Sequence, residues 1–203
     1  MQLKSAKLLS WILHPLLMPL YGIFLIFHYN QVLSAVITAK GEIIIYAVVF
    51  MTTFFLPAVT AWIFLQKGMI NSLQMETKEE RKMPFLITLM YYLIGYYLLL
   101  KFSLQGIFYL ILLAATASVT AAIIINMKWK ISIHLIGIGG IAGVLLGMSH
   151  RFNIDLFFPI IAAFFCAGLL GTARLIMESH NQAQIYSGFL VGFLSELLII
   201  VLW

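Results

Sequence analysis

Seven long apolar runs dominate this chain and restrict it to the interior of a lipid bilayer. Hydrophobic residues make up 63% of the sequence and charged residues 9%, whereas a soluble domain carries about 25% charged residues. Because a chain of 203 residues cannot bury so much apolar surface in a water-soluble core, lipid must be its solvent. The run lengths predict helices, since the strands of a membrane barrel alternate over about ten residues. The predicted spans cover approximately residues 8–29, 43–65, 85–100, 107–125, 131–148, 156–175 and 183–202.

The predicted fold is an all-α polytopic bundle of six to seven transmembrane helices that forms one membrane domain, 1–203. The number stays open because Pro15 and Pro19 favour either a bent first span or a re-entrant segment. The N-terminus is basic and then apolar, but it lacks a small-residue cleavage site and is interpreted as a retained first helix. Cys166 is the one cysteine, which excludes a disulfide within the chain. We expect an integral protein of a bacterial inner (plasma) membrane.

Three polar loops fall on one side of the membrane when the spans alternate, at residues 66–84, 126–130 and 174–182. This side and the N-terminus hold nine Lys and Arg residues and the other side three, which the positive-inside rule would make the cytoplasmic side. Four of the nine are candidate phosphate ligands, and without them the counts are five and three, so the side that carries the site is left open. The nine are Lys4, Lys7, Lys67, Lys78, Arg81, Lys82, Lys128, Lys130 and Arg174; the three are Lys40, Lys101 and Arg151.

Glycines recur every fourth residue in the fifth and seventh spans. Gly139, Gly143 and Gly147 share one face of the fifth span, and Gly188 and Gly192 have the same spacing in the seventh. Small residues at this spacing allow helix backbones to approach closely in a membrane. The pattern predicts that these two helices pack together, with His134 and His180 near their matching ends.

Two short polar islands stand where apolar runs meet the polar loops. One contains Ser132 and His134, and the other contains Arg174, His180 and Gln184. Ionisable groups at a membrane edge are costly and therefore indicate a functional site. Arg presents a planar fork to phosphate oxygens, and a Ser at a helix start can hold an anion together with free backbone N–H groups. One His can attack phosphorus while the other protonates the leaving oxygen.

Other ligand classes fit the two islands less well. Two histidines with few carboxylates at ligand spacing do not complete a metal site, and Glu178 alone does not change this. No metal and no other cofactor is therefore predicted. The net charge of +5 reflects loop lysines and an affinity for anionic lipid or phosphate, not for nucleic acid. The remaining histidines, His14, His28 and His150, are expected to make interfacial or polar contacts.

The islands resemble the motifs of the type 2 phosphatidic acid phosphatase superfamily, which also includes the vanadium haloperoxidases. The third family motif is Ser-Arg, five residues, His, three residues, Asp, and the chain has Ala173-Arg174, five residues, His180, three residues, Gln184. The second motif, Pro-Ser-Gly-His, corresponds to Ile131-Ser132-Ile133-His134. The first, Lys, six residues, Arg-Pro, has a loose counterpart in KEERKMP, with Lys78, Arg81, Lys82 and Pro84 as candidates. The resemblance covers roughly residues 78–192.

The resemblance implies a metal-independent lipid phosphate phosphatase. His180 would be the nucleophile that forms a phosphohistidine, His134 the general acid, and Gln184 the acceptor that orients His180. The implied phosphoryl ligands are Arg174, Ser132, Lys78, Arg81 and Lys82. The implied substrate is a lipid phosphomonoester or diphosphate that enters from the bilayer, such as phosphatidic acid, phosphatidylglycerol phosphate, a polyprenyl diphosphate or a lipid A phosphate. The oligomeric state is not indicated.

Two departures from the family pattern keep alternatives open. Gln184 stands where the family has Asp, and its amide oxygen accepts a hydrogen bond but carries no charge. Ile133 replaces a Gly and restricts the approach of backbone to phosphate. Glu178 would face away from His180 on a helix, and Glu196 would lie roughly 18 Å from Gln184 along the axis. The alternatives are a non-catalytic family member that binds or transports a phosphorylated lipid, and a purely structural membrane subunit.

Overall fold

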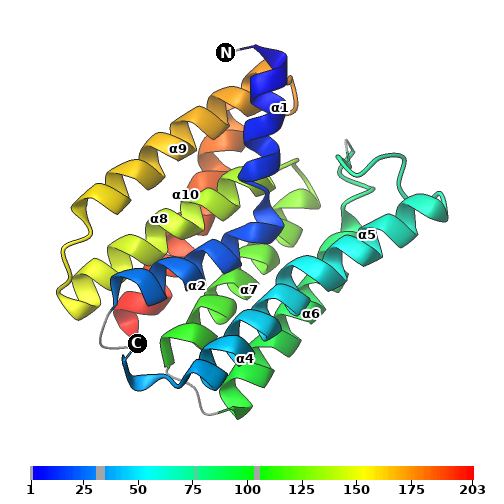
Figure 1. Cartoon of the computed structure of the whole chain (residues 1–203). Helices are drawn as coiled ribbons and strands as arrows, with labels where there is room; N and C mark the ends of the chain where they lie inside the picture. The colour runs from blue at the N-terminus through cyan, green and yellow to red at the C-terminus, as the bar shows by residue number, and fades with distance from the viewer. Residues whose placement is uncertain (1, 31–34, 76, 103–105) are drawn as a thin grey trace.

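The structure, a computed structural model, describes residues 2–30, 35–75, 77–102 and 106–203. The described residues form a helical bundle with seven helices long and apolar enough to cross a membrane, which confirms the predicted fold class (Figure 1). The helical segments are α1 Leu3–Ile12, α2 Met18–Tyr29, α4 Ala39–Val49, α5 Leu56–Gln66, α6 Lys82–Lys101, α7 Gly106–Asn126, α8 Ile133–Phe152, α9 Phe157–Ile176 and α10 Gln182–Leu202, with the short helices η1 Pro15–Leu17 and η2 Phe50–Phe55.

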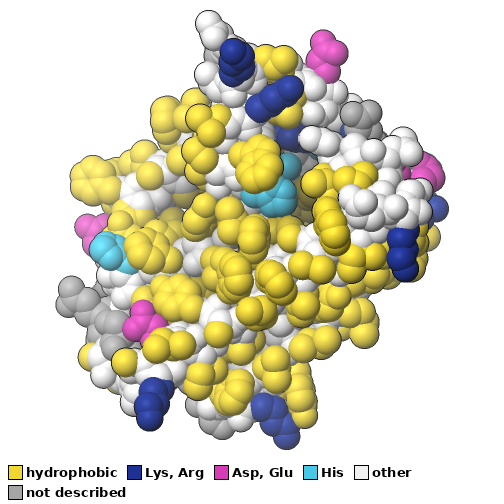
Figure 2. All heavy atoms as spheres, turned by 45° about the vertical axis from the view of Figure 1, so that its right-hand side comes forward, with side chains coloured by type: hydrophobic (Ala, Val, Ile, Leu, Met, Phe, Trp, Pro, Cys, Tyr) yellow, Lys and Arg dark blue, Asp and Glu magenta, His cyan; other side chains and the backbone are white. Residues whose placement is uncertain are grey.

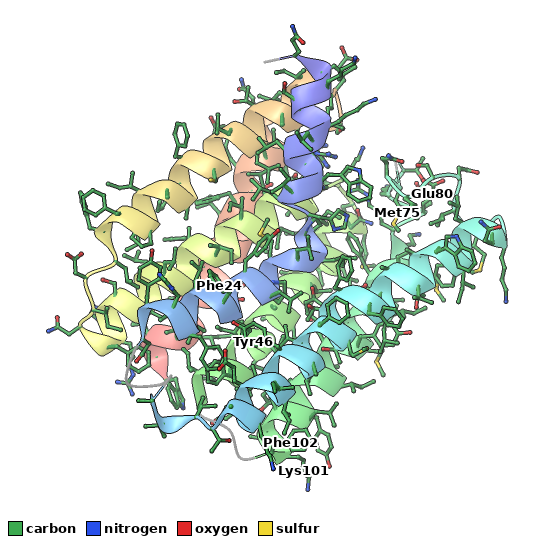
Figure 3. The ribbon with its side chains drawn as sticks, in the orientation of Figure 1. Phe24, Tyr46, Met75, Glu80, Lys101 and Phe102 are labelled. Atoms are coloured by element: carbon green, nitrogen blue, oxygen red, sulfur yellow. The ribbon has the colours of Figure 1, made fainter. Side chains whose placement is uncertain are left out.

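The bundle has two ends, which differ in polarity. Figure 3 shows Met75 and Glu80 on the loop between α5 and α6 at one end, and Lys101 and Phe102 at the other. The end with Met75 and Glu80, called here the polar end, also carries the α7–α8 and α9–α10 connections. The three polar loops therefore do gather on one side, as the alternation of spans predicted.

The first span is broken at His14. The α1 helix ends at Ile12, His14 has extended backbone, and Pro15 opens the short helix η1. The His14 Nδ1 atom accepts a hydrogen bond from the Leu16 N–H at 3.3 Å, which caps η1. Pro15 lacks the N–H that a continuous helix would need at this point. The break lets α1 pack against α9 while α2 packs against α8, so the first span is bent, which is one of the two predicted alternatives.

A π-helical turn interrupts the second span. It covers Phe50–Phe55, just before Pro57 in the first turn of α5. The side chains of Thr52 and Thr53 donate hydrogen bonds to the carbonyls one turn earlier, at 2.8 and 2.9 Å. Such bonds and a nearby proline are common causes of helix distortion. The Thr53 hydroxyl also lies 3.5 Å from the Leu16 carbonyl, so this turn supports the break in the first span.

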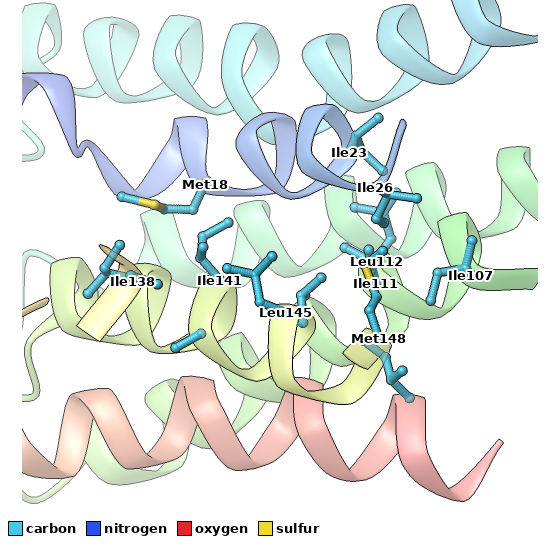
Figure 4. Packing of buried hydrophobic residues seen from close by; sticks show 14 of the residues in the cluster. Met18, Ile23, Ile26, Ile107, Ile111, Leu112, Ile138, Ile141, Leu145 and Met148 are labelled. Atoms are coloured by element: carbon cyan, nitrogen blue, oxygen red, sulfur yellow. The ribbon is translucent and has the colours of Figure 1, made fainter. Parts of the chain in front are cut away.

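The α8 helix forms the centre of the bundle, and its apolar side chains make up much of the core. Figure 4 shows Ile138, Ile141 and Leu145 of α8 facing Met18 of α2 and Ile111 of α7. Ile111 and Leu145 are almost fully buried, and burial of such a side chain contributes roughly 1.5–3 kcal/mol. Ser132 and His134, the predicted site residues at the polar end, therefore stand at the start of the most buried of the seven candidate spans.

The α8 and α10 helices touch backbone to backbone through their glycines. A Cβ atom added to Gly139 or Gly143 would collide with the carbonyl oxygen of Phe189 or Phe193 on α10. In the opposite direction, a Cβ on Gly192 would collide with the Ile136 carbonyl oxygen and lie 2.9 Å from the Gly140 nitrogen. These contacts confirm the predicted packing of the two glycine-bearing spans.

Replacement of Gly192 by Ala is expected to destabilise the bundle, because the added methyl group overlaps backbone that cannot move independently. Overpacking of this kind costs about 1–3 kcal/mol. Gly168→Ala is the matched control, since a Cβ at Gly168 meets nothing within 4 Å and Ala favours a helix. Thermal unfolding in detergent should show a lower melting temperature for Gly192→Ala and an unchanged or higher one for Gly168→Ala. Equal melting temperatures would contradict the close contact of α8 with α10.

Candidate functional site

Two local motifs place Arg174 and His180 relative to each other. The α9 helix ends in a Schellman turn, in which Glu178 and Ser179 donate backbone hydrogen bonds of 2.9 and 3.1 Å to the Leu175 and Arg174 carbonyls. Glu178 has φ +50°, the left-handed conformation that reverses the chain here. The α10 helix then begins with a capping box. The five residues between Arg174 and His180 therefore contain the end of α9 and the chain reversal, and the N-cap of α10 directly follows His180.

Gln184 takes part in this capping box and also binds His180. The Asn181 side chain accepts a hydrogen bond from the Gln184 N–H at 3.0 Å, and the Asn181 N–H donates to Gln184 Oε1 at 3.3 Å. The same Oε1 atom lies 3.0 Å from His180 Nδ1. Because a backbone N–H can only donate, the shared atom must be the amide oxygen, and His180 Nδ1 must carry the proton. The lone pair of His180 therefore resides on Nε2.

His180 is uncharged at neutral pH. Its burial lowers its pKa to about 3, with smaller contributions in the same direction from Arg81, Arg174 and Lys130, and the hydrogen bond to Gln184 opposes this only in part. The Nε2 atom is buried and has no hydrogen-bond partner among the described residues. His180 thus presents a free, unprotonated nitrogen lone pair.

Ser132 and His134 reach the same place from the start of α8. Ser132 is the N-cap of α8, yet its side chain makes no capping hydrogen bond. The Ser132 N–H donates to the Gln184 carbonyl at 3.3 Å, which ties the two islands together. Gly188 makes this approach feasible, since a Cβ there would lie 2.6 Å from the Ser132 carbonyl oxygen. The two helix starts are therefore joined through backbone.

Arg174 lies at the centre of the charges in this region. It interacts electrostatically with His14, Arg81, His134 and His180. It is 6% exposed, its Nε atom has no hydrogen-bond partner, and no carboxylate of a described residue pairs with it. A buried cation without a counter-ion is strongly unfavourable, so this arrangement indicates a place for an anion.

Arg81 is the one candidate from the loop between α5 and α6 that is buried beside the histidines. It is 2% exposed, and its guanidinium donates to the Met75 carbonyl at 2.8 Å and to the Ile131 carbonyl at 3.0 Å. Burial and nearby Arg174 lower the pKa of Arg81 to about 10, so it stays charged. Its carbonyl contacts hold the loop against the residue that precedes Ser132.

The structure does not bring the two predicted lysines, Lys78 and Lys82, to the histidines. Lys82 is exposed, and Lys78 is linked to the bundle through its carbonyl, which accepts a hydrogen bond from the Asn126 side chain at 2.8 Å. Lys130, which the motif comparison did not select, is the lysine that interacts electrostatically with His180. Its position two residues before Ser132 is the sequence feature from which its place near the site could have been predicted.

His14 also belongs to the cluster, although the sequence analysis did not predict it as a site residue. Its ring centroid lies 5.7 Å from that of His134, with the rings edge to face. Because His14 Nδ1 accepts from the Leu16 N–H, the proton of a neutral His14 must be on Nε2. The polar contact expected of His14 is thus present, and the structure adds its place beside His134, which the sequence did not indicate.

Four of the six buried, unpartnered polar side-chain atoms of the described residues belong to this site. The buried side-chain atoms without a hydrogen-bond partner are Asn126 Oδ1, Ser132 Oγ, His134 Nδ1, Arg174 Nε, His180 Nε2 and Glu196 Oε2. Buried polar atoms are normally paired, and each exception calls for an explanation. Figure 2 shows histidine side chains at the edge of a hollow below Lys and Arg side chains. The cluster therefore has the form of a ligand site.

Carboxylates contribute little to the cluster. Glu178 lies in the turn, not on a helix, but it is exposed and is not among the groups that shift the pKa of His180. Glu196 is buried deeper in the bundle beside Gly140. Among the residues that the structure describes, no group of three or more His, Cys, Asp or Glu side chains is placed to hold a metal ion.

Acid is expected to destabilise the protein partly through His180. Its pKa is about 3 in the folded chain and 6.5 as the ordinary value. Between these values the unfolded chain binds a proton that the folded chain does not, so this stability is complete above about pH 6.5 and is lost as the pH falls toward 3. The fall in melting temperature from neutral pH to about pH 5 should be smaller in His180→Asn than in the wild type. His28→Asn is the control, since His28 is exposed and stacks on Phe24 far from the site; equal falls in all three proteins would contradict a neutral His180.

Comparison of the chain with protein-family models, with curated proteins and with solved structures found no match.

Proposed function

We propose that this integral membrane protein is a phosphatase for lipid phosphates that acts through a phosphohistidine at His180. One observation carries the proposal: a buried nitrogen lone pair, His180 Nε2, lies in a cluster whose other unpartnered atoms include the donors Arg174 Nε and Ser132 Oγ. A phosphoryl group is the complement of this cluster, because it combines an electrophilic phosphorus with peripheral oxygen acceptors. The family motifs to which the residues correspond point in the same direction.

The first chemical step is attack of His180 Nε2 on phosphorus. The N–P bond forms as the bond from phosphorus to the leaving oxygen breaks, and His134, in its protonated form, donates a proton to that oxygen, so a lipid alcohol leaves, or a lipid monophosphate when the substrate is a diphosphate. Arg174 and Ser132 stabilise the charge on the three phosphoryl oxygens in the transition state. Gln184 is a positioning residue, since its amide oxygen holds the Nδ1 proton of His180.

The second step returns the enzyme to its starting state. Water attacks the phosphohistidine, His134 accepts one proton of that water, and inorganic phosphate leaves with His180 Nε2 unprotonated. The water and the ester are consumed, and an alcohol and phosphate are formed, so atoms and charges balance.

Purified protein in detergent is expected to release phosphate from a lipid phosphate in the presence of a chelator. The panel is phosphatidic acid, phosphatidylglycerol phosphate, a polyprenyl diphosphate and a lipid A phosphate. His180→Gln should reduce the rate by at least about 10³-fold, because the nucleophile is removed. Trapping with ³²P-labelled substrate should give an acid-labile phosphoprotein in the wild type and none in His180→Gln. His28→Gln is the matched control, and equal rates in the wild type and His180→Gln would refute the mechanism.

Gln184→Glu is expected to raise both the pKa of His180 and the turnover. Glu is as favourable as Gln at this position of a capping box, so the helix start should persist. A carboxylate on His180 Nδ1 would stabilise the positive charge that develops on the ring, and loss of the corresponding charge in a serine protease costs about 10⁴-fold. We expect an increase in kcat of about tenfold or more, together with a higher His180 pKa in an NMR titration, while Gln184→Met should lose activity. A raised pKa without any gain in kcat would show that His180 is not the nucleophile.

A second function, binding or transport of a phosphorylated lipid without hydrolysis, is favoured by the neutral Gln184. In that case none of the panel would yield phosphate, yet the site would still bind the head group. The distinguishing measurement is affinity for phosphatidic acid, which Arg174→Ala should weaken and Arg174→Lys should restore in part, because Lys supplies charge without the planar fork.

A further inference from the structure

A cavity of about 130 Å³ lies inside the bundle, and its lining reaches the sequence neighbours of His14 and His134. At the polar end it is lined by Pro15 and Leu16, next to His14, and by Ile133, next to His134. Along α8 its lining extends from Ile133 to Val144, eleven residues or roughly 16 Å of helix. The walls come mainly from apolar residues of α2, α6, α7 and α8. An elongated apolar cavity of this kind suits a lipid chain.

One acidic side chain lines this apolar cavity. Glu196 of α10 is 5% exposed, and its Oε2 atom has no hydrogen-bond partner among the described residues. Its Oε1 atom lies 3.9 Å from the position that a Cβ on Gly140 would take. Tyr92, which also lines the cavity, interacts electrostatically with it. A carboxyl group at this depth without a polar partner is unfavourable, so a ligand that supplies a hydrogen bond would be selected.

The depth of Glu196 below the phosphate site limits what that ligand can be. Gly140 follows His134 by six residues, which is roughly 9 Å along α8. Side chains on a helix lean toward its N-terminus, which for α10 is the end that carries His180. The carboxyl group of Glu196 therefore faces the site and meets the first oxygen-bearing part of a lipid whose phosphate lies between the histidines.

We infer that the cavity is a chain-binding site for acylglycerol-type lipids, in which the neutral carboxylic acid of Glu196 donates a hydrogen bond to an ester oxygen of the lipid. The inference rests on the proposed function for the position of the phosphate. It favours phosphatidic acid over a polyprenyl phosphate as substrate, since an isoprenoid chain is pure hydrocarbon and leaves Glu196 unpartnered. Glu196 is thus a specificity-determining residue and takes no part in the phosphoryl transfer.

The test compares phosphate release from dioleoyl phosphatidic acid and from a polyprenyl phosphate. The wild type should favour phosphatidic acid in kcat/KM, and Glu196→Leu should reduce that preference about tenfold, the factor that one lost hydrogen bond produces. Glu196→Gln should keep most of the preference, because its amide still hydrogen-bonds. Ala115→Leu, which narrows the cavity without touching Glu196, should lower kcat/KM for both lipids. A preference that is unchanged in Glu196→Leu would overturn the inference.

A binding measurement separates this inference from the proposed function. Dioleoylglycerol, which has no phosphate, should raise the melting temperature of the wild type in detergent, whereas squalene should not, and Glu196→Leu should lose the dioleoylglycerol effect. If no lipid yields phosphate but this pattern appears, the chain site stands and the phosphatase proposal fails. If phosphate is released without any preference and dioleoylglycerol has no effect, the phosphatase proposal stands and the chain site is refuted.

Discussion

The site depends on the direct backbone contact between α8 and α10. His134 and His180 stand at the starts of these helices, and a side chain larger than a hydrogen atom at Gly188 or Gly192 would separate them. The hydrogen bond from the Ser132 N–H to the Gln184 carbonyl crosses this same contact. In a bilayer, where lipid tails are as apolar as the helix surfaces, such close packing is the main force that holds helices together. The same glycines therefore determine both the packing of α8 against α10 and the positions of His134 and His180.

The contact between α8 and α10 lies beside two buried arginine side chains, whose burial is electrostatically unfavourable. Arg81 and Arg174 are both buried, and Arg174 has no carboxylate partner among the described residues. Replacement of such cations by apolar groups often stabilises a protein, so their burial is costly unless an anion binds, as the proposed function requires. Arg81 shows how the cost is limited, since two backbone carbonyls accept its hydrogen bonds. Among the described residues no carbonyl accepts a hydrogen bond from the side chain of Arg174, so it is the cation that would pair with the phosphate of the proposed substrate.

The sequence predicted those features that local composition determines. Run lengths predicted seven spans, their alternation predicted one polar end, and glycine spacing predicted the pairing of α8 with α10, because each depends on a repeating pattern. The place of His14 depends instead on how the broken first span packs on α8 and α9, which no local pattern encodes. Motif spacing likewise could not distinguish buried Arg81 from exposed Lys82, one residue apart. Nor could it show that Glu196 lines a cavity, since only the tertiary fold creates that space.

Gln184 takes part both in the start of α10 and in the orientation of His180, the proposed nucleophile. Its one oxygen accepts both the Asn181 N–H and the Nδ1 proton of His180, so the fold of α10 and the tautomer of His180 are fixed by the same atom. A carboxylate in this place would orient His180 equally well, but its charge would also attract Arg81, Arg174 and Lys130, the cations that interact with His180. A neutral amide leaves those cations free for an anionic ligand, and it gives up the charge that would stabilise a developing imidazolium. If the proposed phosphatase function holds, this arrangement would favour strong binding of a phosphoryl group over rapid turnover.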